Sequence, residues 1–136
     1  MGMTPEQTAN QVRQTLEGGA DMCKDDEMLG DAYNHTMEQR LPKVMDVINR
    51  HADKTGKRMI YLCSITDEPG KIRDKAKRAV GLGANGLLVT YSAGLGMLRE
   101  LTSDPDINVP IMLHASHMIA MMKQIAWPVL ASAGPT

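Results

Sequence analysis

The sequence has no phenylalanine, only two cysteines and no strong excess of either charge. Lysine and arginine together number 15 and aspartate and glutamate 16, so the formal net charge is −1. A nearly neutral chain without a dense basic cluster has no electrostatic attraction for nucleic acid or for an anionic membrane surface. We therefore expect its partners to be small molecules.

Long apolar segments are missing as well. No run approaches the roughly eighteen apolar residues that a membrane-spanning helix needs, and residues 1–10 are polar, unlike a secretion signal. These absences predict a cytoplasmic protein. Cys23 and Cys63 lack CxxC spacing and neighbouring histidines, which favours buried free thiols over a disulfide or a metal pair.

What the sequence does contain is a repeated alternation of apolar strands and amphipathic helices. Its 136 residues, 43% of them hydrophobic, are enough to bury one core, so residues 1–136 are predicted to form a single domain or a piece of one. An initial helix is expected at 4–17. The pattern then predicts strands at 20–24, 58–65, 86–91 and 109–113, and helices at 37–55, 66–81, around 97–101 and at 118–125.

Strands that are apolar on both faces and alternate with helices predict an α/β fold with a parallel sheet and right-handed crossovers. Four such units fit either an open doubly wound sheet or half of an eight-stranded barrel. Gly81, Gly83 and Gly86 precede a strand, whereas the glycines of a dinucleotide-binding motif follow one. A nucleotide-binding sheet is therefore disfavoured.

The first strand runs into a cluster of charges, Lys24-Asp25-Asp26-Glu27. Because side chains alternate along a strand, Lys24 and Asp26 should project to the same side, and Glu27 can join them where the strand ends. If CO2 converted Lys24 to a carbamate, three oxygen-bearing groups would suit magnesium. On the charge pattern alone, however, such a run is more often a solvated turn.

The segment GGADMCKDDE, residues 18–27, resembles the metal-binding signature of RuBisCO and RuBisCO-like proteins. The resemblance covers most of the chain. SITDE, residues 64–68, is similar to the N-I-T-D-[DE] of RuBisCO-like proteins, although serine replaces the asparagine, whereas carboxylases have A-T-A-G-T. The resemblance to this family implies a partial (βα)8 TIM barrel of about four βα units, corresponding to strands 2 to 5 of the family barrel and preceded by one helix.

Carried over residue by residue, the resemblance implies that Mg²⁺ is bound by Lys24 as the CO2-derived carbamate, by Asp26 and by Glu27, while Asp25 supports the strand end. His114 or His117 resembles the family's active-site histidine, and His114 is the favoured catalytic residue. The H-R-A-M-H pattern of carboxylases is absent here. Both histidines could instead be ordinary polar residues near the end of an element.

The implied function is enolisation of a phosphorylated keto sugar or its thio analogue, the step that family members extend to carboxylation, to isomerisation in methionine salvage, or to a lyase reaction. The family's remaining catalytic strands and its N-terminal domain lie outside this chain, so we expect little turnover from it alone. Unpaired sheet edges favour a homo-oligomer or a part of a longer dimeric enzyme. The alternative is a catalytically silent half-barrel that binds a divalent ion or a protein partner.

Overall fold

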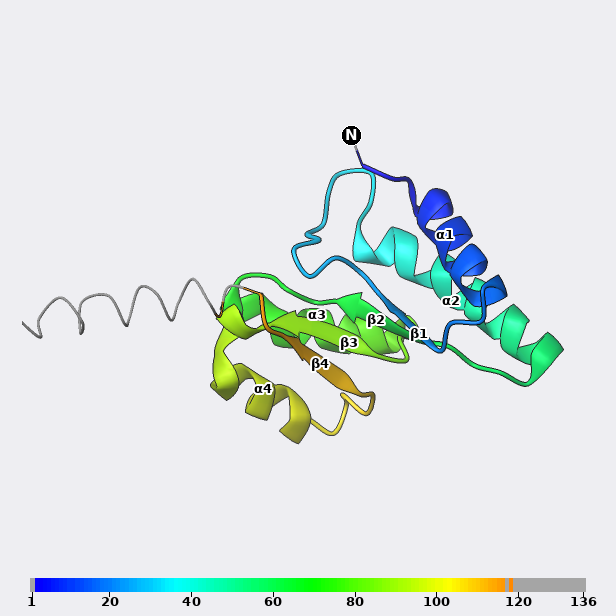
Figure 1. Ribbon diagram of the computed structural model, residues 1–136. Coiled ribbons are helices and arrows are strands. Elements are labelled where there is room, and N and C mark those ends of the chain that lie inside the picture. Colours follow the sequence, from blue (N-terminus) through cyan, green and yellow to red (C-terminus); the bar gives the residue numbers. More distant parts are fainter. Residues whose placement is uncertain (1, 117, 119–136) are drawn as a thin grey trace, which may run out of the picture.

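The computed structural model describes residues 2–116 and 118, and four of its strands form one parallel sheet in the order β1-β2-β3-β4 (Figure 1). The α/β prediction is confirmed. The predicted helix at 118–125 lies outside the described residues, apart from Met118. In chain order the elements are α1 (Pro5–Glu17), β1 (Met22–Lys24), α2 (Met37–Thr55), β2 (Ile60–Ser64), α3 (Pro69–Gly81), β3 (Leu87–Thr90), the 3-10 turn η1 (Tyr91–Ala93), α4 (Gly94–Ser103) and β4 (Ile111–His114).

Capping residues define the starts of α1 and α2, and a glycine defines the end of α2. Thr4 caps α1 and Thr36 caps α2, each by accepting the N–H of a glutamine three residues on, whose side chain accepts the threonine N–H in return. Gly56 ends α2 with a positive φ of 73°, a conformation that costs glycine little. The predicted helices at 4–17 and 37–55 are therefore confirmed.

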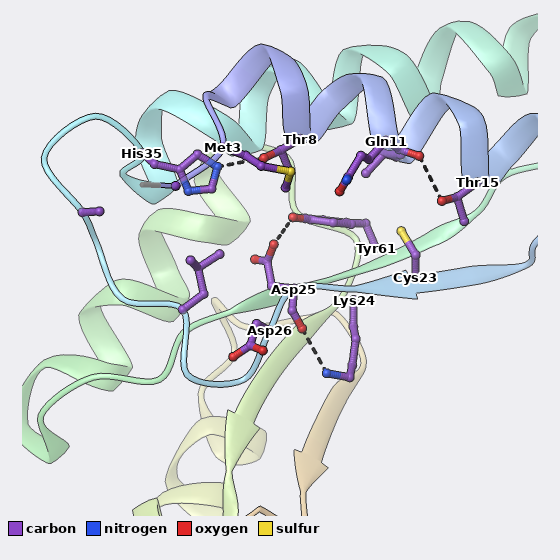
Figure 2. Close-up of a pocket in the computed structure, with 14 residues that line it drawn as sticks. Met3, Thr8, Gln11, Thr15, Cys23, Lys24, Asp25, Asp26, His35 and Tyr61 are labelled. Atoms are coloured by element: carbon purple, nitrogen blue, oxygen red, sulfur yellow. Dashed lines mark hydrogen bonds between the residues drawn. The ribbon is translucent and has the colours of Figure 1, made fainter.

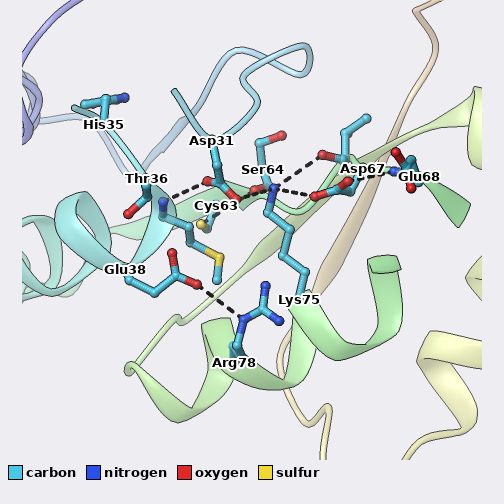
Figure 3. A network of polar contacts seen from close by, with 12 residues as sticks. Asp31, His35, Thr36, Glu38, Cys63, Ser64, Asp67, Glu68, Lys75 and Arg78 are labelled. Carbon is cyan, nitrogen blue, oxygen red and sulfur yellow. Dashed lines mark hydrogen bonds and ion pairs between the residues drawn. The ribbon is translucent and has the colours of Figure 1, made fainter. Parts of the chain in front are cut away.

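The third helix starts later than predicted. It was expected from residue 66, but α3 begins at Pro69, so Asp67 and Glu68 precede the first turn and do not belong to it. The physical reason is that a proline ring disfavours helical backbone at the residue before it. The connection from β2 to α3 therefore stays non-helical and lies at the carboxyl end of the sheet, where Figure 3 shows Asp67 and Glu68.

All four helices contribute to one core on one face of the sheet. Alternate strand residues, such as Tyr61 and Cys63 on β2 and Leu87 and Val89 on β3, join it together with buried residues from α1 to α4. Sequential strand order with helices on a single face is the arrangement of a barrel wall, whereas a doubly wound sheet reverses its strand order and carries helices on both faces. The fold is that of a partial barrel.

The other strand residues point to the opposite face. By the alternation these include Lys24 on β1, Ser64 on β2, Thr90 on β3 and His114 on β4, each the last residue of its strand. Polar groups from four strands thus end at one carboxyl edge, where barrel enzymes place their chemistry. This is the edge at which the predicted site residues lie.

The sequence predicted no membrane-spanning helix and two free, buried cysteines. Among the helices that the structure describes, none combines the length and apolar character needed to span a bilayer. The predicted cytoplasmic location stays a prediction. Cys23 and Cys63 are free cysteines, as expected; Cys63 is buried and Cys23 is partly buried.

Gly86 allows β3 to approach β2 closely. A Cβ atom at this position would lie 2.9 Å from Leu62 Cδ2, 3.0 Å from Ile60 Cγ2 and 3.2 Å from the Tyr61 carbonyl oxygen. Gly86 also accepts the Cys63 N–H at 3.0 Å, so it cannot move away without loss of strand pairing. Its role is close packing between neighbouring strands.

Replacement of Gly86 by alanine is expected to lower the free energy of unfolding by about 1 to 3 kcal/mol, because the added methyl overpacks the β2–β3 contact. Gly81→Ala is the matched control, since a Cβ there meets nothing within 4 Å. Urea denaturation of both variants measures the difference. Equal stability of the two variants would contradict the proposed close approach.

Candidate metal centre

The carboxylate of Asp25 is buried among hydrogen-bond donors directly after β1. Its Oδ2 accepts from Arg40 Nη2 at 2.8 Å and from the N–H of Ser64 at 2.9 Å. Its Oδ1 accepts the hydroxyl of Tyr61, as Figure 2 shows. The Asp25 and Arg40 side chains are only 3% and 1% exposed. Asp25 therefore anchors the end of β1 to α2 and β2, in agreement with its predicted supporting role.

Burial decides the charge states within this cluster. The pKa of Tyr61 is raised well above its ordinary value, chiefly by burial and then by the adjacent Asp25 carboxylate, so its phenol stays a donor. Burial opposes the charge on Arg40, but the Asp25 carboxylate outweighs it and raises the pKa of Arg40. A buried ion pair with such complete hydrogen bonding is costly to break from either side.

With Asp25 held on the helix-covered face, strand alternation leaves Lys24 facing the other way. The Lys24 ammonium lies 3.0 Å from Glu27 Oε2 and donates to the Asp25 carbonyl oxygen at 3.1 Å. Asp26 Oδ1 accepts the Met28 N–H at 2.8 Å, which holds Asp26 in the turn between Lys24 and Glu27. The structure thus pairs Lys24 with Glu27 and places Asp26 between them in the chain.

His114, at the end of β4, also approaches Glu27. Its Nδ1 lies 3.6 Å from Glu27 Oε1 and accepts the N–H of Ser116 at 3.1 Å. Because Nδ1 accepts that hydrogen bond, neutral His114 carries its proton on Nε2. Lys24, Glu27 and His114 therefore meet across the carboxyl edge, from β1 to β4. His117 lies outside the described residues.

The electrostatics suit a carbamate better than a lysine as metal ligand. The pKa of Glu27 is lowered by its own backbone N–H and then by Lys24, with a further contribution from His114, so Glu27 is an anion at neutral pH. Within residues 2–116 and 118, no three carboxylate, imidazole or thiol groups are gathered as a metal site. In this arrangement the Lys24 ammonium lies beside Glu27, and Asp26 Oδ1 is engaged by the Met28 N–H. An anionic carbamate there would complete a set of hard oxygen ligands for Mg²⁺.

Cys23 does not join such a set. Burial, followed by the negative charge of Asp25, raises the pKa of its thiol to about 11, and the pKa of Cys63 is raised to about 12 for the same reasons. Both stay protonated at neutral pH, which disfavours either thiol as a nucleophile or as a metal ligand.

A cavity of about 330 Å³ lies between α1 and β1, next to the segment from Lys24 to Asp26 (Figure 2). Its walls include Val12, Cys23 and Leu29, and Asp25 and Tyr61 line it from the sheet side. The cavity lies beside the Asp25 cluster, and Lys24 and Asp26 also line it, so it reaches the segment that carries the candidate metal ligands.

Arg40 and Tyr61 were not predicted from the sequence as site residues. One signal was available for Arg40: it lies within the apolar stripe of α2, close in helical spacing to Met37, Leu41 and Val44, all of which are buried. A cation at a core position demands a buried anion. For Tyr61, which reads as an ordinary strand residue, the sequence carries no comparable signal.

Comparison with known proteins places this chain in a family. Residues 1–131 match the sequence model described as ribulose bisphosphate carboxylase large chain, catalytic domain. The chain is 39% identical over 111 residues to the ribulose bisphosphate carboxylase-like protein of Archaeoglobus fulgidus, covering 81% of this chain and 25% of that protein. The chain therefore belongs to the RuBisCO large-chain family, and the predicted resemblance is confirmed.

Two further relatives refine the comparison. A 2,3-diketo-5-methylthiopentyl-1-phosphate enolase of Exiguobacterium sibiricum is 38% identical over 133 residues, covering 92% of this chain and 33% of the enzyme. The crystal structure of a RuBisCO-like protein from Alicyclobacillus acidocaldarius superposes with a TM-score of 0.80 at 32% identity, covering 88% of this chain and 31% of that one. The chain spans between a quarter and a third of these relatives.

Removal of the buried cation tests the Asp25 cluster. Arg40→Met is expected to lower the free energy of unfolding by about 3 to 5 kcal/mol, because it leaves the Asp25 carboxylate buried without its counter-ion. Arg50→Met is the matched control on the same helix, where Arg50 pairs with Asp46 at the surface, and it should change stability by less than about 1 kcal/mol. Chemical denaturation measures both. Equal losses of unfolding free energy in the two variants would contradict a larger contribution from the buried ion pair.

His35 makes folding stability depend on pH. It is 7% exposed and lies 2.8 Å from Thr8 Oγ1 through Nε2, and its pKa is lowered from 6.5, first by burial and then by Arg40. The unfolded chain therefore binds the proton first, so this contribution to stability is complete above about pH 6.5 and falls as the pH drops below it. His35→Gln should lose this slope below about pH 6.5. If thermal unfolding of His35→Gln shows the same dependence of stability on pH as the wild type, His35 is not the source of that dependence.

Proposed function

We propose that this chain provides the metal-ligand segment of a RuBisCO-like enzyme that enolises a phosphorylated keto sugar or its thio analogue with Mg²⁺. The observation that carries the proposal is the meeting of Lys24, Glu27 and His114 at the carboxyl edge, with Asp26 in the intervening turn and Asp25 withdrawn. Relatives named as 2,3-diketo-5-methylthiopentyl-1-phosphate enolases support this choice of reaction.

Carbamylation of Lys24 is the chemical step that would create the third ligand. The Lys24 ammonium first releases a proton to solvent. The neutral amine then attacks the carbon of CO2, one C=O electron pair moves onto oxygen, and a second proton leaves the nitrogen to solvent. The product is an anion where a cation stood, so the attraction between Lys24 and Glu27 becomes repulsion. Binding of Mg²⁺ would relieve that repulsion, which couples the carbamate to the metal.

The residues at this edge have separate roles in the proposal. Lys24 as carbamate, Asp26 and Glu27 would hold Mg²⁺, which when bound supplies positive charge that stabilises negative charge developing on substrate oxygens during enolisation. His114 is proposed as a catalytic residue that contacts substrate beside Glu27. The buried hydroxyls of Ser64, Thr66 and Ser116 have no hydrogen-bond partner among the described residues, which makes them candidates to bind substrate oxygens.

This chain is proposed to act as one part of a larger site. Because it spans between a quarter and a third of its relatives, we propose that phosphate-binding and further proton-transfer groups come from barrel segments those relatives have in addition. In the described sheet β1 and β4 are the edge strands, and Met22 and Ile60 are exposed. Unpaired edges of this kind favour association with another barrel segment or a second copy.

The test is calorimetric titration with Mg²⁺ in the presence of bicarbonate. Wild-type protein is expected to bind the cation only when bicarbonate is present, and Lys24→Ala should abolish that binding. Lys43→Ala is the control, because Lys43 pairs with Glu6 at the surface. Binding that persists in Lys24→Ala would contradict the carbamate. If wild-type protein binds no Mg²⁺, the proposal fails, and the alternative of a catalytically silent βα half-barrel that binds a protein partner is favoured.

A further inference from the structure

A second buried cation lies at the carboxyl edge, in the layer between α2 and α3. The side chain of Lys75, on α3, is 1% exposed. Its ammonium lies 3.1 Å from Asp31 Oδ2 and 3.2 Å from Asp67 Oδ2, and it donates to the Thr66 carbonyl oxygen at 3.5 Å (Figure 3). One lysine thus holds two carboxylates and a backbone carbonyl from outside its own helix.

The two carboxylates belong to different connections of the barrel. Asp31 lies between β1 and α2, four residues after Glu27, and Asp67 lies between β2 and α3. Each is also tied to backbone: Asp31 Oδ1 accepts the Met37 N–H at 2.9 Å, and Asp67 Oδ1 accepts the Glu68 N–H at 2.8 Å. Both carboxylates are therefore fixed to the start of a helix on one side and to Lys75 on the other.

Lys75 neutralises two neighbouring carboxylates, Asp31 and Asp67. Burial alone would raise the pKa of Asp67, but the Glu68 N–H and Lys75 lower it below its ordinary value. Asp31 and Asp67 are themselves only 30% and 27% exposed. Without the ammonium, two partly buried anions would face each other and repel. Lys75 thus opposes separation of the two connections.

We infer that Lys75 is a positioning residue for the candidate metal centre, acting through Asp31 to fix the connection that carries Glu27. The inference rests on the proposed function. Residues 25–36 form no helix or strand of the sheet, and the connection is anchored at its start by the Asp25 cluster and further along by Asp31. Glu27 lies between these two anchors. Loosening the second anchor should widen the range of positions that Glu27 samples.

The decisive variant is Asp31→Asn. An asparagine still accepts the Met37 N–H but loses the ion pair with Lys75, which leaves Lys75 paired with Asp67. The expected result is roughly 10-fold weaker Mg²⁺ binding in bicarbonate, the effect typical of residues that orient metal ligands. Amide hydrogen exchange at Glu27 and Met28 should become faster. Lys75→Met should give a larger change of the same kind, and Lys75→Arg should restore part of the affinity.

Asp46→Asn is the matched control, because Asp46 pairs with Arg50 on the exposed side of α2. Titrations are made at a temperature where circular dichroism shows every variant to be folded. If Asp31→Asn lowers only the melting temperature, and leaves Mg²⁺ affinity and exchange at Glu27 unchanged, Lys75 serves stability alone and the inference is overturned. If wild-type protein binds no Mg²⁺ in bicarbonate, the proposed function fails and the inference fails with it.

Discussion

The buried ion pair between Asp25 and Arg40 is the constraint on which the rest of the site depends. A carboxylate that is 3% exposed must have its charge and hydrogen bonds satisfied, and Arg40, Tyr61 and the Ser64 N–H do so together. This fixes which way β1 presents its side chains. With Asp25 on the helix side, Lys24 is directed to the opposite face, toward Glu27.

Lys75 forms a second buried ion-pair cluster of the same kind at this edge of the sheet. In both clusters a basic residue on a helix enters the layer next to the sheet and binds acidic residues that follow a strand. The helices, which are rigid, thereby hold connections that have no regular structure of their own. Asp25 and Asp31 anchor the connection after β1 on both sides of Glu27. The positions of the proposed ligands thus depend on two buried cations, Arg40 and Lys75.

The sequence was sufficient for the alternation of strands and helices, for the helix at 37–55 and for the proximity of Lys24 and Glu27, because these depend on local periodicity and on a short motif. It was insufficient for the start of α3, where Pro69 overrides an apparent helix in Asp67 and Glu68. Arg40 and Lys75 could have been suspected, since each is a cation within an apolar stripe. Their partners could not, because those pairs form between distant segments only once the sheet has assembled.

The measurement that tests the account most directly is a crystal structure of the protein with Mg²⁺ and bicarbonate. The account predicts a carbamate on Lys24 that binds the cation together with Asp26 and Glu27, while Asp25 keeps its contacts with Arg40 and Tyr61. A cation bound by Asp25, or an unmodified Lys24 still paired with Glu27 at saturating Mg²⁺ and bicarbonate, would contradict it.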